Sequence, residues 1–247
     1  MNTLHRNDDG LRTATARARR TFRYFLRELS WERRRIVRAY TMMAVKARFP
    51  TSTRDDPEYG EHMWLDHVEF DGTTVTGTLL SGSYEPSDFS AGDQVEALFE
   101  EQASDWLIAS EDAVYGAYTV HLIRSRMSDE ERTLYNEQWD LPFGHPALPK
   151  LPNATSETDE TDHPMALNMV QKVEAEIRAN PSQLRSLDAR GWTWLHEEVL
   201  SGNAAIVEIL LRHGADREAK TLDGFTPLAL ATTWGWSRIA AMLRARG

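Results

Sequence analysis

Cysteine is absent from this sequence of 247 residues, which excludes disulfides, thiolate catalysis and cysteine-ligated zinc. Long apolar runs are lacking as well: no stretch approaches the roughly 20 apolar residues that a membrane-spanning helix needs. The first ten residues contain no apolar run of the kind found in a secretory signal peptide. We therefore expect a cytoplasmic protein without a membrane partner.

Common catalytic motifs are also missing. The sequence contains neither a Gly-x-Ser-x-Gly nucleophile elbow nor a phosphate-binding P-loop. The segment that begins at His196 starts like the helix of a zinc protease, but Leu200 stands where the second zinc-binding histidine is required. The sequence accordingly predicts no catalytic residue, no metal and no cofactor, and it favours a protein that is not an enzyme.

One enzymatic alternative stays open in the middle of the chain. His62 and Asp66 are four residues apart on a predicted strand, so their side chains point to the same face. If His121 lay opposite His62, the three side chains would form the two-histidine, one-carboxylate set of a metal site. This alternative is a metal-dependent or hydrolytic enzyme, and the plainer interpretation is a set of surface polar residues beside a buried Trp64.

Charge is distributed unevenly along the chain. Residues 1–48 carry a net charge of +9, residues 49–164 carry −20 and residues 165–247 carry +1, within an overall net charge of −10. The acidic middle suits a basic macromolecular partner, whose approach it would steer. We expect the basic N-terminal helix to lie on the acidic middle of its own chain, so that a nucleic-acid partner is the weaker alternative. That alternative depends on Arg17, Arg19, Arg20, Arg23, Arg33, Arg34 and Arg35.

The C-terminal sixty residues repeat themselves at an offset of about 33 positions, which is the spacing of a helical repeat array. Thr193 and Thr226 suit the N-cap of a helix, and Pro227 suits its first position. Gly214 suits the left-handed position that ends a helix. The matched positions are Gly191 with Gly224, Thr193 with Thr226, Leu195 with Leu228, and Gly202 with Gly235.

These motifs resemble the ankyrin repeat family, and the resemblance implies a short all-α solenoid that binds another protein. Two repeats are clear, and residues 166–180 predict a degenerate one before them, because Val173 and Ile177 lie 33 positions before Ile206 and Leu210. Solenoid repeats bury their core only against neighbours. We therefore expect the repeats to dock on the rest of the protein or on a partner.

Two positions depart from the ankyrin pattern. Trp194 stands where the next repeat has Pro227, and Glu198 stands where it has the small Ala231. A buried carboxylate needs a partner or water, so Glu198 either reaches a neighbouring arginine or solvent, or faces a ligand. The second interpretation predicts a partner-binding surface of Trp192, Trp194, Glu197, Glu198, Trp234 and Trp236. Glu61 and Asp105 are predicted as further contact residues.

The rest of the chain predicts an α+β domain, which is an antiparallel sheet with flanking helices. Asp71-Gly72 between two β-branched segments is a strong hairpin signal, and Ser128 with Glu131 forms a capping box that opens a helix. Strands are predicted at 39–49, 61–70, 73–80, 93–99, 106–109 and 115–123, and helices at 14–29 and from 128 to about 138. The predicted boundaries are 1–11 for a loose N-terminus, 12–142 for the α+β domain, 143–164 for a proline-rich acidic linker and 165–247 for the repeats.

The α+β region also carries a resemblance of its own. Its ordered motifs include Gly60-Glu61-His62-Met63-Trp64-Leu65, Gly92-Asp93-Gln94-Val95 and Ser104-Asp105-Trp106. These resemble the YegJ-like bacterial domain of unknown function over residues 17–145. By analogy with small bacterial domains beside secreted toxins, we expect an interaction protein, most specifically an immunity protein that neutralises a basic toxin or effector.

Overall fold

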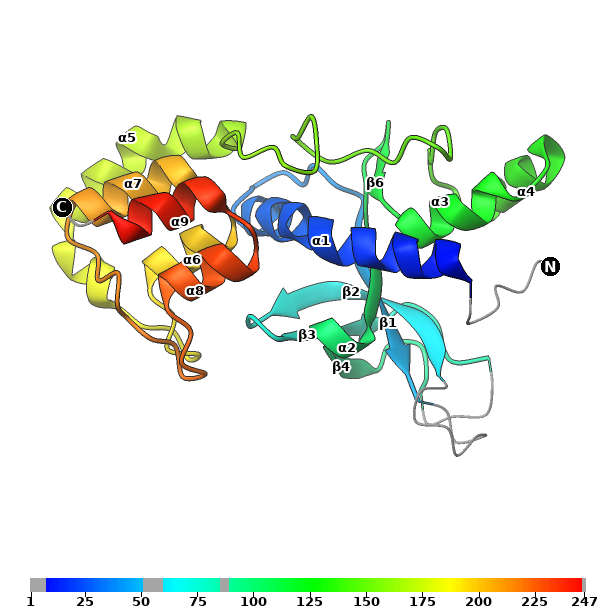
Figure 1. The fold of residues 1–247 in the computed structure, drawn as a ribbon, viewed down its shortest axis with the longest axis horizontal. Coiled ribbons are helices and arrows are strands. Elements are labelled where there is room, and N and C mark those ends of the chain that lie inside the picture. Colours follow the sequence, from blue (N-terminus) through cyan, green and yellow to red (C-terminus); the bar gives the residue numbers. More distant parts are fainter. Residues whose placement is uncertain (1–7, 51–59, 85–88, 246–247) are drawn as a thin grey trace. The chain divides into compact units, whose positions relative to one another are not determined.

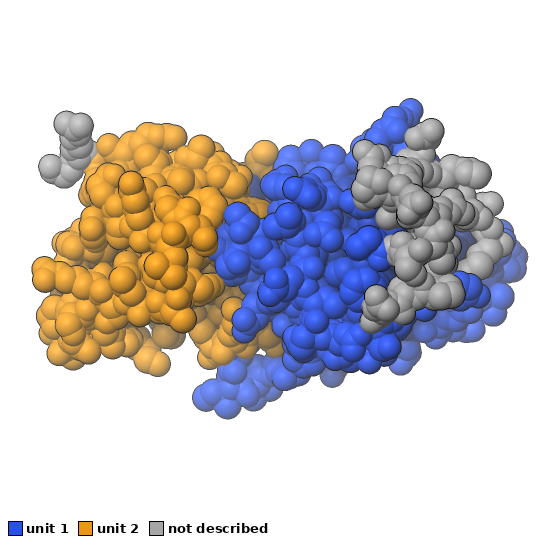
Figure 2. Space-filling view, turned by 90° about the horizontal axis from the view of Figure 1, so that it is seen from below, with its two compact units in different colours: residues 1–25, 35–152 blue, residues 26–34, 153–247 orange. Residues whose placement is uncertain are grey.

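The computed structural model describes residues 8–50, 60–84 and 89–245. The chain forms two compact units, coloured separately in Figure 2. Unit 1 contains residues 1–25 and 35–152, and unit 2 contains residues 26–34 and 153–247. The first helix, α1 (Asp9–Glu32), therefore contributes residues to both units. Among the described residues, no helix combines the length and apolar character that crossing a membrane requires.

Unit 1 is built on a six-stranded antiparallel sheet with the order β4-β3-β2-β1-β5-β6 (Figure 1). The first four strands form a meander, and β5 returns to pair with the other side of β1. The predicted hairpin at Asp71-Gly72 is confirmed, and the Asp71 carboxylate accepts from the amides of Thr73 and Thr74. The strands are β1 (Met42–Phe49), β2 (Glu61–Phe70), β3 (Thr74–Leu79), β4 (Gln94–Leu98), β5 (Ala103–Ala109) and β6 (Val114–Gly116).

Helices pack against both faces of this sheet, which gives the expected α+β architecture. On one face, α1 places Phe22 against the rings of Phe70 and Phe99, the latter from the short helix α2 (Phe99–Gln102). On the other face, Leu107 packs in a cluster with Val120 of α3 (Tyr118–Ser125). Helix α4 (Asp129–Trp139) begins with the predicted capping box of Ser128 and Glu131.

The predicted strand at 115–123 is wrong: β6 ends at Gly116, and α3 begins at Tyr118. Two successive residues with positive φ, Gly116 at 71° and Ala117 at 52°, turn the chain out of the sheet. The buried Asp105 carboxylate then accepts from the amides of Tyr118 and Thr119 at the start of α3. A long-range cap therefore overrides the β-propensity of this apolar, β-branched segment.

The N-terminal helix is longer than the sequence predicts. It begins at Asp9 within the segment predicted to be loose, and it continues to Glu32, beyond the predicted end at residue 29. The Asp8 carboxylate accepts from the amides of Gly10 and Leu11, which satisfies free donors of the first turn. Residues 1–7 of the predicted loose N-terminus lie outside the described residues, as do residues 51–59.

Unit 2 contains two successive helix pairs, preceded by a longer helix (Figure 1). Thr193 caps the first pair by accepting from the His196 amide, and Thr226 caps the second by accepting from the Ala229 amide. The predicted helix before the pairs exists and packs its buried Val173 and Ile177 toward the first pair. The elements are α5 (Pro164–Ala179), η1 (Pro181–Arg185), α6 (Trp194–Leu200), α7 (Ala204–Arg212), α8 (Pro227–Thr233) and α9 (Ser237–Arg244).

The acidic residues 156–162, predicted as part of a linker, belong to unit 2 and bind its helices. The Asp162 carboxylate accepts from the Ala205 amide in the first turn of α7 and from the Arg238 guanidinium at 2.7 Å. Glu160 accepts from the Arg238 amide in the first turn of α9. Carboxylates near helix N-termini are favoured by the exposed amides and the helix dipole. The segment therefore stabilises the start of both outer helices.

Candidate partner-binding surface

Glu198 is a fully buried carboxylate in the first repeat, and its donors come from within unit 2. It accepts hydrogen bonds from the Arg34 guanidinium at 2.8 Å, the Trp194 indole at 2.8 Å and the Asn203 amide at 2.7 Å. A buried charge is tolerated when it is paired and hydrogen-bonded. The interpretation in which Glu198 pairs with an arginine is therefore confirmed, and the carboxylate is not presented to a ligand.

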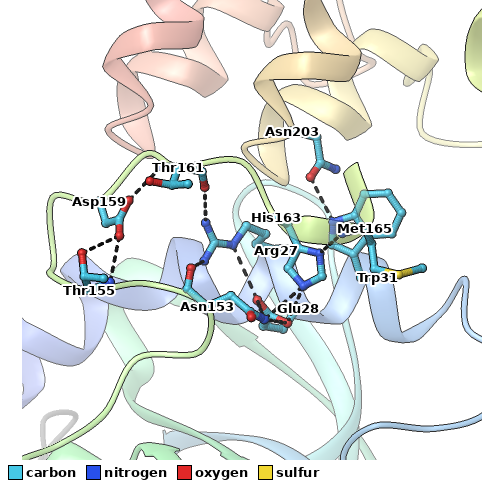
Figure 3. A network of polar contacts seen from close by, with 10 residues as sticks. All are labelled: Arg27, Glu28, Trp31, Asn153, Thr155, Asp159, Thr161, His163, Met165 and Asn203. Atoms are coloured by element: carbon cyan, nitrogen blue, oxygen red, sulfur yellow. Dashed lines mark hydrogen bonds and ion pairs between the residues drawn. The ribbon is translucent and has the colours of Figure 1, made fainter. Parts of the chain in front are cut away.

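Residues Leu26–Arg34 of α1 and the following turn pack into the helical unit beside this carboxylate. Trp31 is buried, and its indole donates to the Asn203 side chain at 3.0 Å. The same ring stacks on His163 at 5.5 Å and on the Arg34 guanidinium at 4.8 Å. Figure 3 shows Trp31 between His163 and Asn203. The segment thus supplies buried aromatic and charged groups to the repeats.

A second polar network anchors the same segment (Figure 3). The buried Arg27 donates to the carbonyls of Asn153 at 2.8 Å and Thr161 at 3.2 Å. The buried Glu28 carboxylate accepts from the Asn153 amide at 3.1 Å and lies 3.2 Å from Nε2 of His163. These side chains bind one another and the backbone inside the unit. Their arrangement is that of a structural network.

Most of the predicted partner-binding residues of unit 2 lie inside it. Trp192, Glu198, Trp234 and Trp236 are buried, and the Trp236 indole donates to the carbonyl of Leu200 at 3.1 Å. Their side chains are therefore core groups in this structure. The prediction of a contact surface is left with the half-buried Trp194 and Glu197.

Trp194 and Glu197 both line an open pocket of about 400 Å³ on unit 2. The loop before α6 supplies Leu187, whose side chain is 62% exposed. Burial raises the pKa of Glu197, although the nearby Arg190 guanidinium opposes this. The remaining lining residues are Glu176, Gln183, Ser186, Asp188, Trp192 and Thr193.

The two predicted contact residues of unit 1 have local roles. The Glu61 carboxylate accepts from the Tyr84 amide at 2.7 Å. Asp105 is buried and caps α3 as described above, and it also accepts from the Thr119 hydroxyl at 2.6 Å. Burial raises the pKa of Asp105, and the Thr119 hydrogen bond and the Lys46 charge oppose that rise. Asp105 therefore positions a helix, and Glu61 orders a loop.

The residues of the metal-site alternative have separate partners. His62 Nδ1 lies 2.9 Å from the Ser104 hydroxyl, and Asp66 pairs with His67 at 2.8 Å. His121 lies on α3, so the strand pairing with His62 that this alternative needs does not exist. Across residues 8–50, 60–84 and 89–245, no three histidine, aspartate or glutamate side chains are grouped as a metal site would need.

His62 and His121 both have a lowered pKa, which keeps their rings neutral. Loss of water around the ring, together with the charges of Lys46 and Arg48, lowers the pKa of His62 to about 4. Burial and the charge of Arg124 lower the pKa of His121 to about 4. At neutral pH neither ring therefore carries a positive charge.

Several arginines of the nucleic-acid alternative make contacts inside the chain. Arg19 donates to the Ala103 carbonyl at 2.7 Å, and Arg34 binds Glu198. The guanidinium groups of Arg17 and Arg35 lie over the rings of Tyr118 and Tyr40. Arg23 is buried and donates to the Tyr24 hydroxyl at 2.9 Å, while Arg20 and Arg33 also have interaction partners. These groups bind the protein itself, which leaves the alternative without a specific observation in its favour.

The sequence did not reveal Arg34 and Trp31, which bind Glu198 and Asn203, or Leu187, which lines the pocket. Arg34 and Trp31 are 164 and 172 positions from their partners Glu198 and Asn203, so no local pattern connects them. The available signal was the charged residue at a position that the next repeat fills with Ala231, because such a charge requires a distant donor. Leu187 was also missed, since an exposed leucine in a loop is unremarkable in a sequence.

The chain belongs to the bacterial family described as "Uncharacterized protein conserved in bacteria (DUF2314)", which matches residues 8–143. It is 36% identical over 241 residues to "Putative ankyrin repeat protein NMB1133/NMB1171" of Neisseria meningitidis serogroup B, covering 97% of this chain and 94% of that protein. "Protein phosphatase 1 regulatory subunit 27" of Mus musculus is 37% identical over 78 residues, or 32% of this chain and 51% of that protein. "Potassium channel AKT1" of Oryza sativa subsp. indica is 43% identical over 56 residues, or 23% of this chain and 6% of that protein.

These findings confirm two expectations from the sequence, a bacterial domain of unknown function and a likeness to ankyrin repeat proteins. The chain is a member of a bacterial family of unknown function, and it resembles a named ankyrin repeat protein over nearly its whole length. Such a relative is consistent with a protein that acts by contact with another protein.

Proposed function

We propose that this protein is a protein-binding module whose helix pairs α6–α7 and α8–α9 form a short ankyrin-type solenoid. The observation that supports it best is repetition at an offset of 33 residues: Thr193 and Thr226 cap α6 and α8 in the same way. The buried Ile206, Val207 and Leu210 of α7 likewise correspond to the buried Ile239, Ala240 and Leu243 of α9. The loops before α6 and α8 expose Leu187 at 62% and Leu222 at 77%. Exposed apolar residues on rigid loops are typical of interaction surfaces.

The test is to reconstitute a complex with the full chain. Crosslinking in the native host followed by mass spectrometry would nominate partners, and each candidate would then be purified and titrated against the protein. We expect Leu187→Ser and Leu222→Ser to weaken the complex. Leu134→Ser is the matched control, because Leu134 is also 62% exposed but lies on α4 of unit 1. A complex weakened by Leu134→Ser alone would refute the proposed surface.

A more specific proposal is that the partner is a basic bacterial toxin or effector in the cytoplasm, so that the protein serves as an immunity protein. The support is the charge of −20 on residues 49–164, which would attract a basic partner. The test is to express the product of the neighbouring reading frame with and without this protein. Growth arrest that co-expression does not relieve would refute this role while leaving a different protein partner possible.

A further inference from the structure

Three consecutive segments of unit 2 line the pocket. Helix α5 supplies Glu176, the 3-10 turn η1 supplies Gln183, and the loop and first turn of α6 supply Leu187, Trp192 and Trp194. The lining is mostly apolar. Its volume of about 400 Å³ is within the range of roughly 300–1,000 Å³ for sites that hold small ligands. It can therefore receive a large side chain with part of its backbone.

The loop that forms one wall of this pocket is preorganised by Asp188. Its carboxylate accepts from the amides of Arg190 at 2.9 Å and Trp192 at 2.8 Å, and from the Arg190 guanidinium at 2.8 Å. The same guanidinium pairs with Glu197 and lies 4.7 Å from the centre of the Trp192 ring. A wall that is already ordered loses little conformational entropy when a ligand binds.

The pocket is negatively charged, and two of its polar side chains, Glu176 and Gln183, are available to bind a ligand. Glu176, Asp188 and Glu197 contribute three carboxylates, and Arg190 is paired with the last two, which leaves a net charge of −2 for the four groups. Within the described part of the chain, the carboxylate of Glu176 forms no ion pair and the side-chain amide of Gln183 forms no hydrogen bond. A cation that enters the pocket would therefore find a carboxylate that is not yet neutralised.

We propose that this pocket receives an arginine side chain of the protein partner, an inference that rests on the proposed function. The apolar walls of Trp194 and Leu187 suit the aliphatic stem, and the carboxylate of Glu176 suits the head group. Arginine fits better than lysine, because its planar guanidinium stacks on aromatic rings and is more weakly hydrated. Leu187 lines the pocket and is exposed, which predicts an apolar residue next to that arginine in the partner.

The experiment selects a phage-displayed library of random dodecapeptides on the immobilised full-length protein and measures the Kd of enriched synthetic peptides by fluorescence anisotropy. We expect enriched peptides to share an arginine beside an apolar residue. Replacing that arginine with methionine should raise the Kd about tenfold or more, as loss of a hot-spot contact does. Glu176→Lys should raise it several-fold at low salt and less at high salt.

Matched variants keep the outcome interpretable. Leu187→Ser changes a side chain that is 62% exposed, and Glu208→Lys makes the same charge change as Glu176→Lys on the exposed surface of α7. We expect Leu187→Ser to weaken binding several-fold and Glu208→Lys to leave it unchanged. Peptides without a basic residue, or equal effects of the two lysine variants, would overturn the inference. If Leu222→Ser weakens the binding of peptides without a basic residue and Leu187→Ser does not, the proposed protein-binding role is kept and only the pocket assignment fails. Failure to enrich any peptide would also overturn the pocket assignment, and the reconstituted complex would then decide the wider role.

Discussion

The two helix pairs of unit 2 have the same capping threonines but differ at the positions that face their neighbours. Glu198 and Asn203 of the first pair correspond to Ala231 and Trp236 of the second. In the first pair these polar side chains bind groups from residues 26–34, whereas in the second pair the Trp236 indole donates within the repeats. The divergence between two copies of a repeat thus identifies the copy that receives another part of the chain.

Removal of the tryptophan that enters the first pair should have the largest effect. Trp31 is 1% exposed, and truncation of a buried tryptophan costs about 3–5 kcal/mol. We expect Trp31→Ala to lower the free energy of unfolding of unit 2 by that amount in a urea titration. Ile36→Ala, at a fully exposed position nearby in the sequence, should change it by less than about 0.5 kcal/mol. Equal values for the two variants would show that residues 26–34 are not part of the folded unit.

Copying the second pair into the first is the next test. Glu198→Ala should cost about 2–4 kcal/mol, because Trp194 and Asn203 lose their acceptor and Arg34 loses its counter-ion. Adding Arg34→Met to Glu198→Ala should cost less than the sum of the single changes, with a coupling of about 1–2 kcal/mol in a double-mutant cycle. Glu208→Ala is the exposed control. Strict additivity would contradict a direct interaction between Arg34 and Glu198.

Glycine-to-alanine changes in the two repeats should lower the stability by different but smaller amounts. Gly202 of the first repeat has a φ of +69° and Gly224 of the second has +83°, so alanine at either position is strained by about 1 kcal/mol. A Cβ at Gly202 would also lie 2.3 Å from the Trp236 ring, whereas one at Gly224 would meet nothing within 4 Å. We therefore expect Gly202→Ala to lower the thermal midpoint clearly more than Gly224→Ala. The reverse order would indicate that the Trp236 ring moves freely.

Acid should affect the first repeat through His196, whose counterpart in the second repeat is the non-titrating Ala229. Burial lowers the pKa of His196, although the carbonyls of Phe225 and Ala219 oppose this. A lowered histidine pKa contributes stability that is present above about pH 6.5 and is lost as the pH falls toward the folded-state pKa. Protonation also removes the Nδ1 acceptor of the Thr193 amide.

The measurement is the thermal midpoint of the wild type and of His196→Gln between pH 7.5 and 5. Because His121 and His62 are present in both proteins, their contributions cancel in the comparison. We expect the wild type to lose more stability on acidification than the variant. Parallel curves would mean that His196 titrates normally in the folded protein.

Local patterns predicted much of this fold. The hairpin at Asp71-Gly72 and the capping box at Ser128 depend on residues within a few positions of one another. The 33-residue offset is visible when the chain is aligned with itself. The helix at 118–125 could not be predicted in this way, because its N-terminal amides are satisfied by Asp105 on another element. The partner of the buried Glu198, Arg34, was likewise hidden by a separation of 164 positions.

The discontinuity of unit 2 has a consequence for protein synthesis. Trp31 leaves the ribosome long before Asn203, which is 172 residues further along the chain. At about 5–20 residues per second, the delay is on the order of 10–30 s. During that interval the Trp31 indole and the charged groups beside it cannot make their native contacts, because the residues that bind them have not been translated. Nascent chains stalled before residue 203 should therefore engage chaperones more strongly than chains released at full length.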